Sequence, residues 1–136
     1  MREAVRLVGR LVLGAFLVFA GVAHQVAVEE FLGQVPSFLP WREAVVVVSG
    51  LVEIALGLAL LVTCGRVRVV TGWLVAVLFV VVFPGNVWQL VNGSTSFGLD
   101  TATSRVVRLF FQPLLVAWAL WCTGAWRAGR GHLRNR

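Results

Sequence analysis

Glu53 is the residue whose setting in this chain points most directly to chemistry. It is the only charged residue in the apolar run 44–64, and a run of that length can cross a bilayer as a helix. At about 1.5 Å per residue, Glu53 would lie ~14 Å inside a hydrocarbon core about 30 Å thick. A carboxylate at that depth is costly unless it is paired, hydrated or protonated, so Glu53 predicts a functional site.

Each of the four apolar runs brings polar residues to the same half of the membrane, the outer half, as Glu53. Ser49 lies four residues before Glu53 and therefore shares its helix face. The other members of the set are His24, Asn86, Gln89, Arg105, Arg108 and Gln112. Because the opposite halves of the runs are nearly all apolar, we expect these side chains to form one cluster in the outer half of the membrane.

Arg108 is the expected partner of Glu53, and His24 is the second candidate. The Cα–Cβ bonds of a helix lean toward its N-terminus, so Glu53 and Arg108 lean outward while His24 leans inward. The long side chain of Arg108 would close the remaining difference in depth. The alternative is that the polar contacts only hold the helices together, as buried polar groups do in many membrane proteins.

Two prolines lie inside the apolar runs, close to the polar residues. Pro84 and Pro113 each remove a backbone hydrogen bond and free a carbonyl four residues earlier, at Val80 and Leu109. Membrane helices tolerate such breaks where neighbours or water satisfy the backbone. The prolines therefore predict a kinked, partly hydrated pocket beside the cluster.

The composition identifies a membrane protein. Of 136 residues, 59% are hydrophobic and only 13% are charged, about half the charged fraction of a typical soluble domain. Four runs are long enough to span a bilayer, show no strand alternation and exceed the length of small-barrel strands. These spans are residues 4–23, 44–64, 69–91 and 106–126. We expect an all-α, integral membrane four-helix bundle that forms a single domain over residues 1–126.

Small residues recur at seven-residue spacing in the first two spans. Gly14 is followed by Gly21, and Gly50 by Gly57. Seven residues are nearly two helical turns, so each pair clears one strip of helix surface for close approach of a neighbouring backbone. The pattern predicts a tightly packed bundle.

The arginines predict the orientation. The chain has a net charge of +6, and its 12 strongly basic residues are all arginine. They concentrate before the first span, between the second and third, and after the fourth, which places both termini and the turn 64–68 in the cytoplasm. The tail 127–136 is expected to be a solvated, basic flank attracted to anionic membrane lipid. Nothing else in the chain indicates nucleic-acid binding.

The connection between the first two spans is expected to contain a short amphipathic helix. Its apolar residues, at helical spacing, are Val28, Phe31, Leu32 and Val35, and its polar residues are Glu29, Glu30 and Gln34. Pro36 and Pro40 would end it. Such a helix is typical of a segment that lies on the outer membrane interface.

Two local features allow alternative interpretations. The first span, with small residues at 21–23, is similar to a cleavable signal peptide; we expect it to be retained, because three spans follow. Cys64 and Cys122 lie at the ends predicted to be cytoplasmic, where thiols stay reduced. The absence of a Cys-x-x-Cys pair disfavours a dithiol centre. No haem, iron–sulfur, flavin or metal motif occurs, so no built-in cofactor is predicted.

Five short segments together resemble the DoxX-like family, small prokaryotic membrane proteins of four helices that are grouped with MauE-type proteins. The segments are Gly21-Val-Ala-His24, Val35-Pro-Ser-Phe-Leu-Pro40, Ser49-Gly-Leu-Val-Glu53-Ile-Ala-Leu-Gly57, Phe83-Pro-Gly-Asn86 and Arg108-Leu-Phe-Phe-Gln112. The resemblance runs over nearly the whole chain except its tails. Two positions depart from the family pattern: Gln25 stands where an aromatic residue is common, and the proline of the last segment is displaced to Pro113.

The resemblance implies a redox-linked role in the membrane. The name-giving relatives are membrane subunits of a thiosulfate:quinone oxidoreductase, and MauE-type relatives assist maturation of a periplasmic dehydrogenase. We therefore expect a subunit with an outer-leaflet pocket for a quinone or similar amphipathic molecule. Glu53 and His24 would handle protons, and the ligand-binding residues would be Arg108, Asn86, Gln112, Ser49 and Gln89. A quinone site needs such a proton path beside an apolar slot.

Other functions remain open at this point. The main alternative is a non-catalytic anchor or assembly factor for a redox or envelope enzyme, and a small transporter, formed as a homo-oligomer, is a third. No autonomous catalytic motif is present, so any electron donor would have to be a partner protein.

Overall fold

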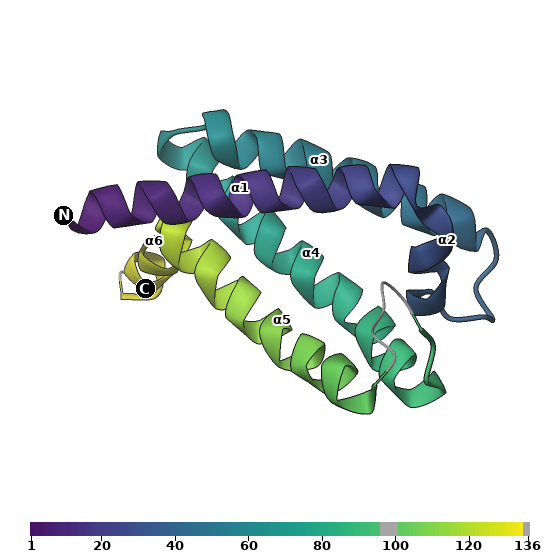
Figure 1. The fold of residues 1–136 in the computed structure, drawn as a ribbon. Coiled ribbons are helices and arrows are strands. Elements are labelled where there is room, and N and C mark those ends of the chain that lie inside the picture. Colours follow the sequence, from purple (N-terminus) through teal and green to yellow (C-terminus); the bar gives the residue numbers. More distant parts are fainter. Residues whose placement is uncertain (96–100, 135–136) are drawn as a thin grey trace.

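The computed structural model describes residues 1–95 and 101–134, which are helical over most of their length (Figure 1). The helices are α1 (Arg2–Val26), α2 (Val28–Phe31), the 3₁₀ helix η1 (Leu32–Gln34), α3 (Arg42–Val62), α4 (Gly65–Asn92), α5 (Ala102–Thr123) and α6 (Ala125–Arg134). By length and composition, α1, α3, α4 and α5 are all apolar enough to cross a membrane. The predicted all-α chain with four helices of membrane-spanning length is confirmed.

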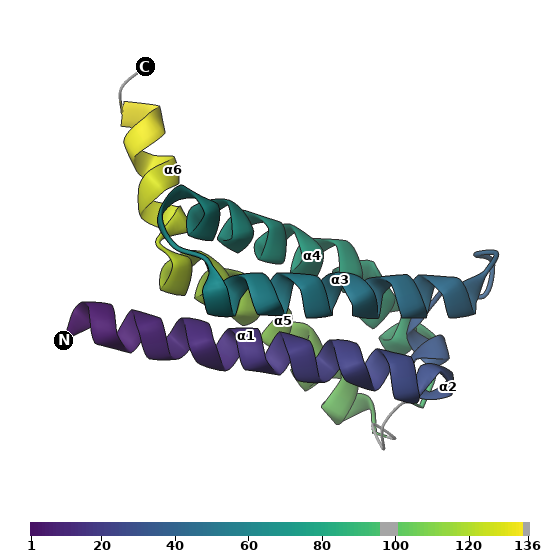
Figure 2. The ribbon, with the colours of Figure 1, turned by 90° about the horizontal axis from the view of Figure 1, so that it is seen from above.

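The end of the fourth predicted span differs from the structure. We expected that span to run to Trp126, but α5 ends at Thr123 and α6 begins at Ala125. Gly124 separates the two helices because it adopts the left-handed conformation, with φ of 77°, which glycine adopts without steric cost. The basic tail therefore begins as a second helix that points away from the bundle (Figure 2).

The four long helices pack as two pairs. α1 lies along α3, and α4 lies along α5, with the second pair crossing the first at an angle (Figure 1). Glycines bring α1 and α3 together: a Cβ atom on Gly14 would lie 2.9 Å from the carbonyl oxygen of Gly57, and one on Gly21 would lie 2.5 Å from that of Gly50. Helix packing at both predicted glycine pairs is thus confirmed.

A small apolar core lies where the two helix pairs meet. Its fully buried members come from all four long helices and are Leu13, Leu17, Leu60, Val75 and Ala119. Many other large apolar side chains stay exposed, including Phe19 at 73% and Phe110 at 71%. An exterior this apolar is the expected surface of helices surrounded by lipid tails.

Both chain termini lie at one end of the bundle, as four successive spans require (Figures 1 and 2). We call this end the terminal end. The opposite end carries α2 and η1, and we call it the cap end.

The cap, residues 27–41, packs onto the ends of α1 and α3. Phe31 and Val35 are buried against Val46 of α3. The guanidinium group of Arg42 donates hydrogen bonds to the carbonyl of Val35, at 3.0 and 3.2 Å, and to that of Leu32. The carbonyl of Val35 lies just past the end of η1, where no further helical turn supplies a donor, whereas that of Leu32 also accepts the backbone N–H of Val35 at 3.1 Å.

Arg42→Gln is expected to loosen the cap. The charged hydrogen bonds to Leu32 and Val35 are each worth about 1.5–3 kcal/mol, so amide protons of residues 32–35 should exchange with solvent at least about ten times faster. Hydrogen exchange measured by mass spectrometry would show this. Arg2→Gln, which removes an exposed arginine at the terminal end, should leave the same amides unchanged, and equal exchange in both variants would contradict the role of Arg42.

Candidate functional site

The seven predicted site residues occupy all four long helices toward the cap end. α1 carries His24, α3 carries Ser49 and Glu53, α4 carries Asn86 and Gln89, and α5 carries Arg108 and Gln112. We call them the cap-end cluster. Four of its members are buried: Glu53, Asn86, Gln89 and Gln112.

Glu53 contacts His24, and the two form an ion pair when the histidine is protonated. The Oε2 atom of Glu53 lies 3.1 Å from Nδ1 of His24, and both side chains are largely buried. The same Nδ1 lies 2.8 Å from the carbonyl oxygen of Ala20 in its own helix. One ring nitrogen therefore serves two acceptors, and Oε2 is a buried atom without a well-directed hydrogen bond from the described residues.

Arg108, the expected first partner of Glu53, contacts two glutamines instead. Its Nη2 donates to Oε1 of Gln34 at 2.9 Å, and its Nη1 donates to Oε1 of Gln89 at 3.4 Å. These neutral acceptors hold the guanidinium group away from direct contact with the carboxylate, although its charge still attracts that of Glu53. The second candidate, His24, is thus the ion-pair partner, and the expected Glu53–Arg108 pair is corrected.

Asn86 and Gln112 form a chain of hydrogen bonds between α4 and α5. Nδ2 of Asn86 donates to Oε1 of Gln112 at 3.1 Å, and Nε2 of Gln112 donates to the carbonyl of Phe79 at 3.0 Å. Both side chains are buried, so these bonds satisfy polar groups that would otherwise be costly in an apolar interior. The two amides lie together as predicted.

Gln89 and Ser49 differ in how closely they join the cluster. Gln89 is only 1% exposed and bridges Arg108 to the carbonyl of Ser94, to which it donates at 3.3 Å. The hydroxyl of Ser49 donates to the carbonyl of Val46 in its own helix at 2.8 Å. Ser49 shares the helix face of Glu53 but uses its proton locally, as serines inside helices commonly do.

The prolines do not contribute to the cluster in the expected way. Pro84 and Pro113 both lie on exposed faces of their helices, and Val80, whose carbonyl Pro84 leaves free, is exposed as well. A freed carbonyl lies beneath the proline ring on the same side of the helix. The hydrated pocket predicted from these breaks therefore has no support at the cluster.

Two residues of the site were not predicted as members. Gln34 was assigned to the polar side of a helix lying on the membrane surface, yet it binds Arg108. Phe31 stacks on the His24 ring, with centroids 3.7 Å apart and planes at 22°. Both reach the site because the cap folds back over the ends of α1 and α3, which the amphipathic pattern could not indicate.

The described residues offer little to a metal ion or a dithiol centre. No three His, Cys, Asp or Glu residues among positions 1–95 and 101–131 lie close enough to hold a metal. Both cysteines are free thiols, Cys64 exposed and Cys122 buried. Two prominent cavities lie at the terminal end rather than beside Glu53.

Comparison with known proteins gives one family. Residues 13–123 match the model of a family described as a domain of unknown function, DUF8561. The matched range covers every member of the cap-end cluster. Searches of curated proteins and of solved structures each gave no match.

Proposed function

The chain belongs to the DUF8561 family, and we propose that it is a redox-associated membrane protein whose cap-end cluster binds a quinone or similar amphipathic molecule. The observation that carries this proposal is the partner of the buried carboxylate. An arginine keeps its charge at all physiological pH values, whereas a histidine gains and loses its proton near neutrality. A Glu53–His24 pair can therefore exchange protons where a Glu53–Arg108 pair would only neutralise charge.

The surrounding residues suit a polar headgroup that has carbonyl oxygens. A quinone takes up protons when it is reduced, so its site needs proton donors beside hydrogen-bond donors. Glu53 and His24 would supply protons. Asn86 and Gln112 would give up the hydrogen bond between them and donate instead to a carbonyl of the ligand. Arg108 would stabilise negative charge on the ligand or on Glu53.

The electrons would come from a partner protein, because the sequence has no haem, iron–sulfur or flavin motif. The resemblance to the DoxX-like family supports a role beside a redox enzyme. We place the protein in the cytoplasmic membrane of a prokaryote, as the resemblance to the DoxX-like family implies. The cap end would face outward, as the arginine distribution predicts.

Glu53→Gln tests the proposal directly. It preserves shape and removes the exchangeable charge, so the affinity for ubiquinone-1 should fall about ten-fold, the equivalent of one charged hydrogen bond. The pH dependence of binding between about pH 5 and 8 should also flatten. Quenching of tryptophan fluorescence would report binding, because Trp88 lies between Asn86 and Gln89 on α4.

Glu43→Gln is the matched control, because it makes the same change at an exposed position of α3. It should bind ubiquinone-1 like the unmodified protein. Equal binding by the Glu53 and Glu43 variants, or no binding by the unmodified protein, would refute the quinone site.

The second candidate is an anchor or assembly factor whose cap docks a partner protein. The cap exposes two large aromatic residues, Phe38 at 74% and Trp41 at 82%, and it also exposes the acids Glu29 and Glu30. Exposed aromatics of this kind are common at protein interfaces and at the membrane surface. For an anchor, Trp41→Ala should remove a copurifying partner that Glu53→Gln retains. For the quinone site, Glu53→Gln should weaken the binding of ubiquinone-1, which Trp41→Ala should leave unchanged.

A further inference from the structure

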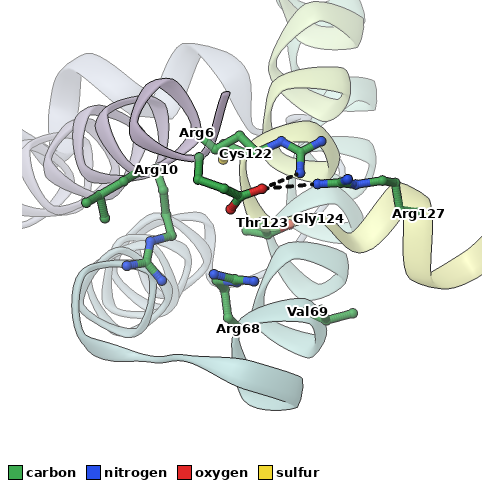
Figure 3. Close-up of a pocket in the computed structure, with 10 residues that line it drawn as sticks. Arg6, Arg10, Arg68, Val69, Cys122, Thr123, Gly124 and Arg127 are labelled. Atoms are coloured by element: carbon green, nitrogen blue, oxygen red, sulfur yellow. Dashed lines mark hydrogen bonds and ion pairs between the residues drawn. The ribbon is translucent and has the colours of Figure 1, made fainter. Parts of the chain in front are cut away.

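A cavity of about 440 Å³ opens at the terminal end, where four helices meet (Figure 3). Its charged lining residues are Arg6 and Arg10 from α1, Arg68 from α4, Arg127 from α6, and Glu3. Figure 3 shows the four guanidinium groups gathered around one space. We call it the basic cavity.

The single carboxylate in the basic cavity does not balance its arginines. Glu3 lies 3.4 Å from both Arg6 and Arg127, but its side chain is 78% exposed, so these ion pairs are weak. Arg10 donates to the carbonyl of Thr63 at the end of α3, at 2.6 Å. The Nε atom of Arg68 is buried and has no hydrogen-bond partner in the described part of the chain. An anion would satisfy both the excess charge and this donor.

A second cavity, of about 390 Å³, adjoins the basic cavity and is mostly apolar. The two share Arg6, Gly124 and Arg127, and the second continues along α5 past Leu120 and Val116 to Pro113. We call it the apolar groove. From Gly124 to Pro113 it extends about 16 Å, close to the ~15 Å of hydrocarbon in one leaflet.

We infer that the basic cavity and the apolar groove together bind an anionic phospholipid. The phosphate would lie among the arginines, which suit phosphate because their planar groups donate paired hydrogen bonds. One acyl chain would lie along α5 in the groove, and Trp121 and Trp126 would flank the headgroup level, where tryptophan is enriched. Free phosphate would bind the arginines of the basic cavity, but it would leave the apolar groove without an occupant. By the expected orientation, this is a lipid of the cytoplasmic leaflet.

Arg68→Gln should reduce the binding of phosphatidylglycerol about five-fold, the effect of one arginine near an anionic lipid. The full-length protein in detergent would be titrated with phosphatidylglycerol or phosphatidylcholine, and retained lipid counted by native mass spectrometry. Arg66→Gln is the matched control, because Arg66 is exposed two residues earlier on the same helix. It should retain phosphatidylglycerol within about two-fold of the unmodified protein.

A second variant and a second ligand separate the possible outcomes. Ala117→Trp, at an exposed position lining the groove, should weaken the binding of phosphatidylglycerol. Any effect of inorganic phosphate on the melting temperature of the protein should stay unchanged. If inorganic phosphate stabilises the protein as much as the lipid does, the ligand is free phosphate and the lipid site is wrong. Equal loss in the Arg66 and Arg68 variants, or equal retention of both lipids, would also overturn it. Circular dichroism would establish that each variant is folded.

Discussion

Gly21→Val is expected to force α1 away from α3 and to destabilise the bundle by about 3 kcal/mol, the upper end of the cost of overpacking. A Cβ atom at this position would lie 2.5 Å from the carbonyl oxygen of Gly50 and 2.6 Å from Cγ1 of Ile54. A backbone oxygen cannot move aside as a flexible side chain can, so the helices must separate. Reversible unfolding in mixed micelles of mild detergent and dodecyl sulfate would measure the loss.

The same substitution should also disturb the cap-end cluster. Gly21 lies three residues before His24, and Gly50 three residues before Glu53, so the glycine contact is one turn from the ion pair. Gly131→Val provides the control, because a Cβ atom there would meet nothing within 4 Å. Equal stability of the two variants would show that close approach of α1 and α3 does not hold the bundle together.

His24→Leu is expected to cost about 3 kcal/mol, because it leaves a buried carboxylate without its partner. Replacing both residues, as His24→Leu with Glu53→Leu, should recover most of that loss, since an apolar pair carries no buried charge. The same micelle unfolding experiment applies. The double variant separates loss of the ion pair from loss of packing, which would persist in it.

Arg108→Leu distinguishes the observed pairing from the one that the sequence favoured. If His24 is the true partner, His24→Leu should lower the free energy of unfolding more than Arg108→Leu does. The side chain of Arg108 donates its hydrogen bonds to the neutral side chains of Gln34 and Gln89, so its loss leaves no unpaired charge. If Arg108 neutralised Glu53, the order would reverse. Strictly additive effects of His24→Leu and Glu53→Leu would mean that the two residues do not interact.

Much of the architecture could be read from local properties of the chain. A membrane span must satisfy its own backbone hydrogen bonds, so its length and apolar content are visible in consecutive residues. The segments that became α1, α3, α4 and α5 were predicted in this way, and the glycine pairs at 14, 21, 50 and 57 marked the close contact of α1 with α3. The boundary between α5 and α6 was harder to predict, because the break at Gly124 depends on one backbone dihedral angle.

The location of the cap-end cluster in one half of the bundle also followed from sequence, because helical spacing gives the depth and face of each polar residue. The pairing within it did not. Arg108 could reach several acceptors, and Gln34 entered the site only because the cap folds over it, so the partner of Glu53 depended on packing between helices. The basic cavity depended on packing even more, since Arg6, Arg68 and Arg127 are far apart in the chain and meet only through the assembled bundle. The depth and the face of a residue are local properties of its helix. The residues that it meets on other helices, and the rotation of each helix about its axis, are set by how the helices pack. Packing therefore made a histidine the partner of Glu53.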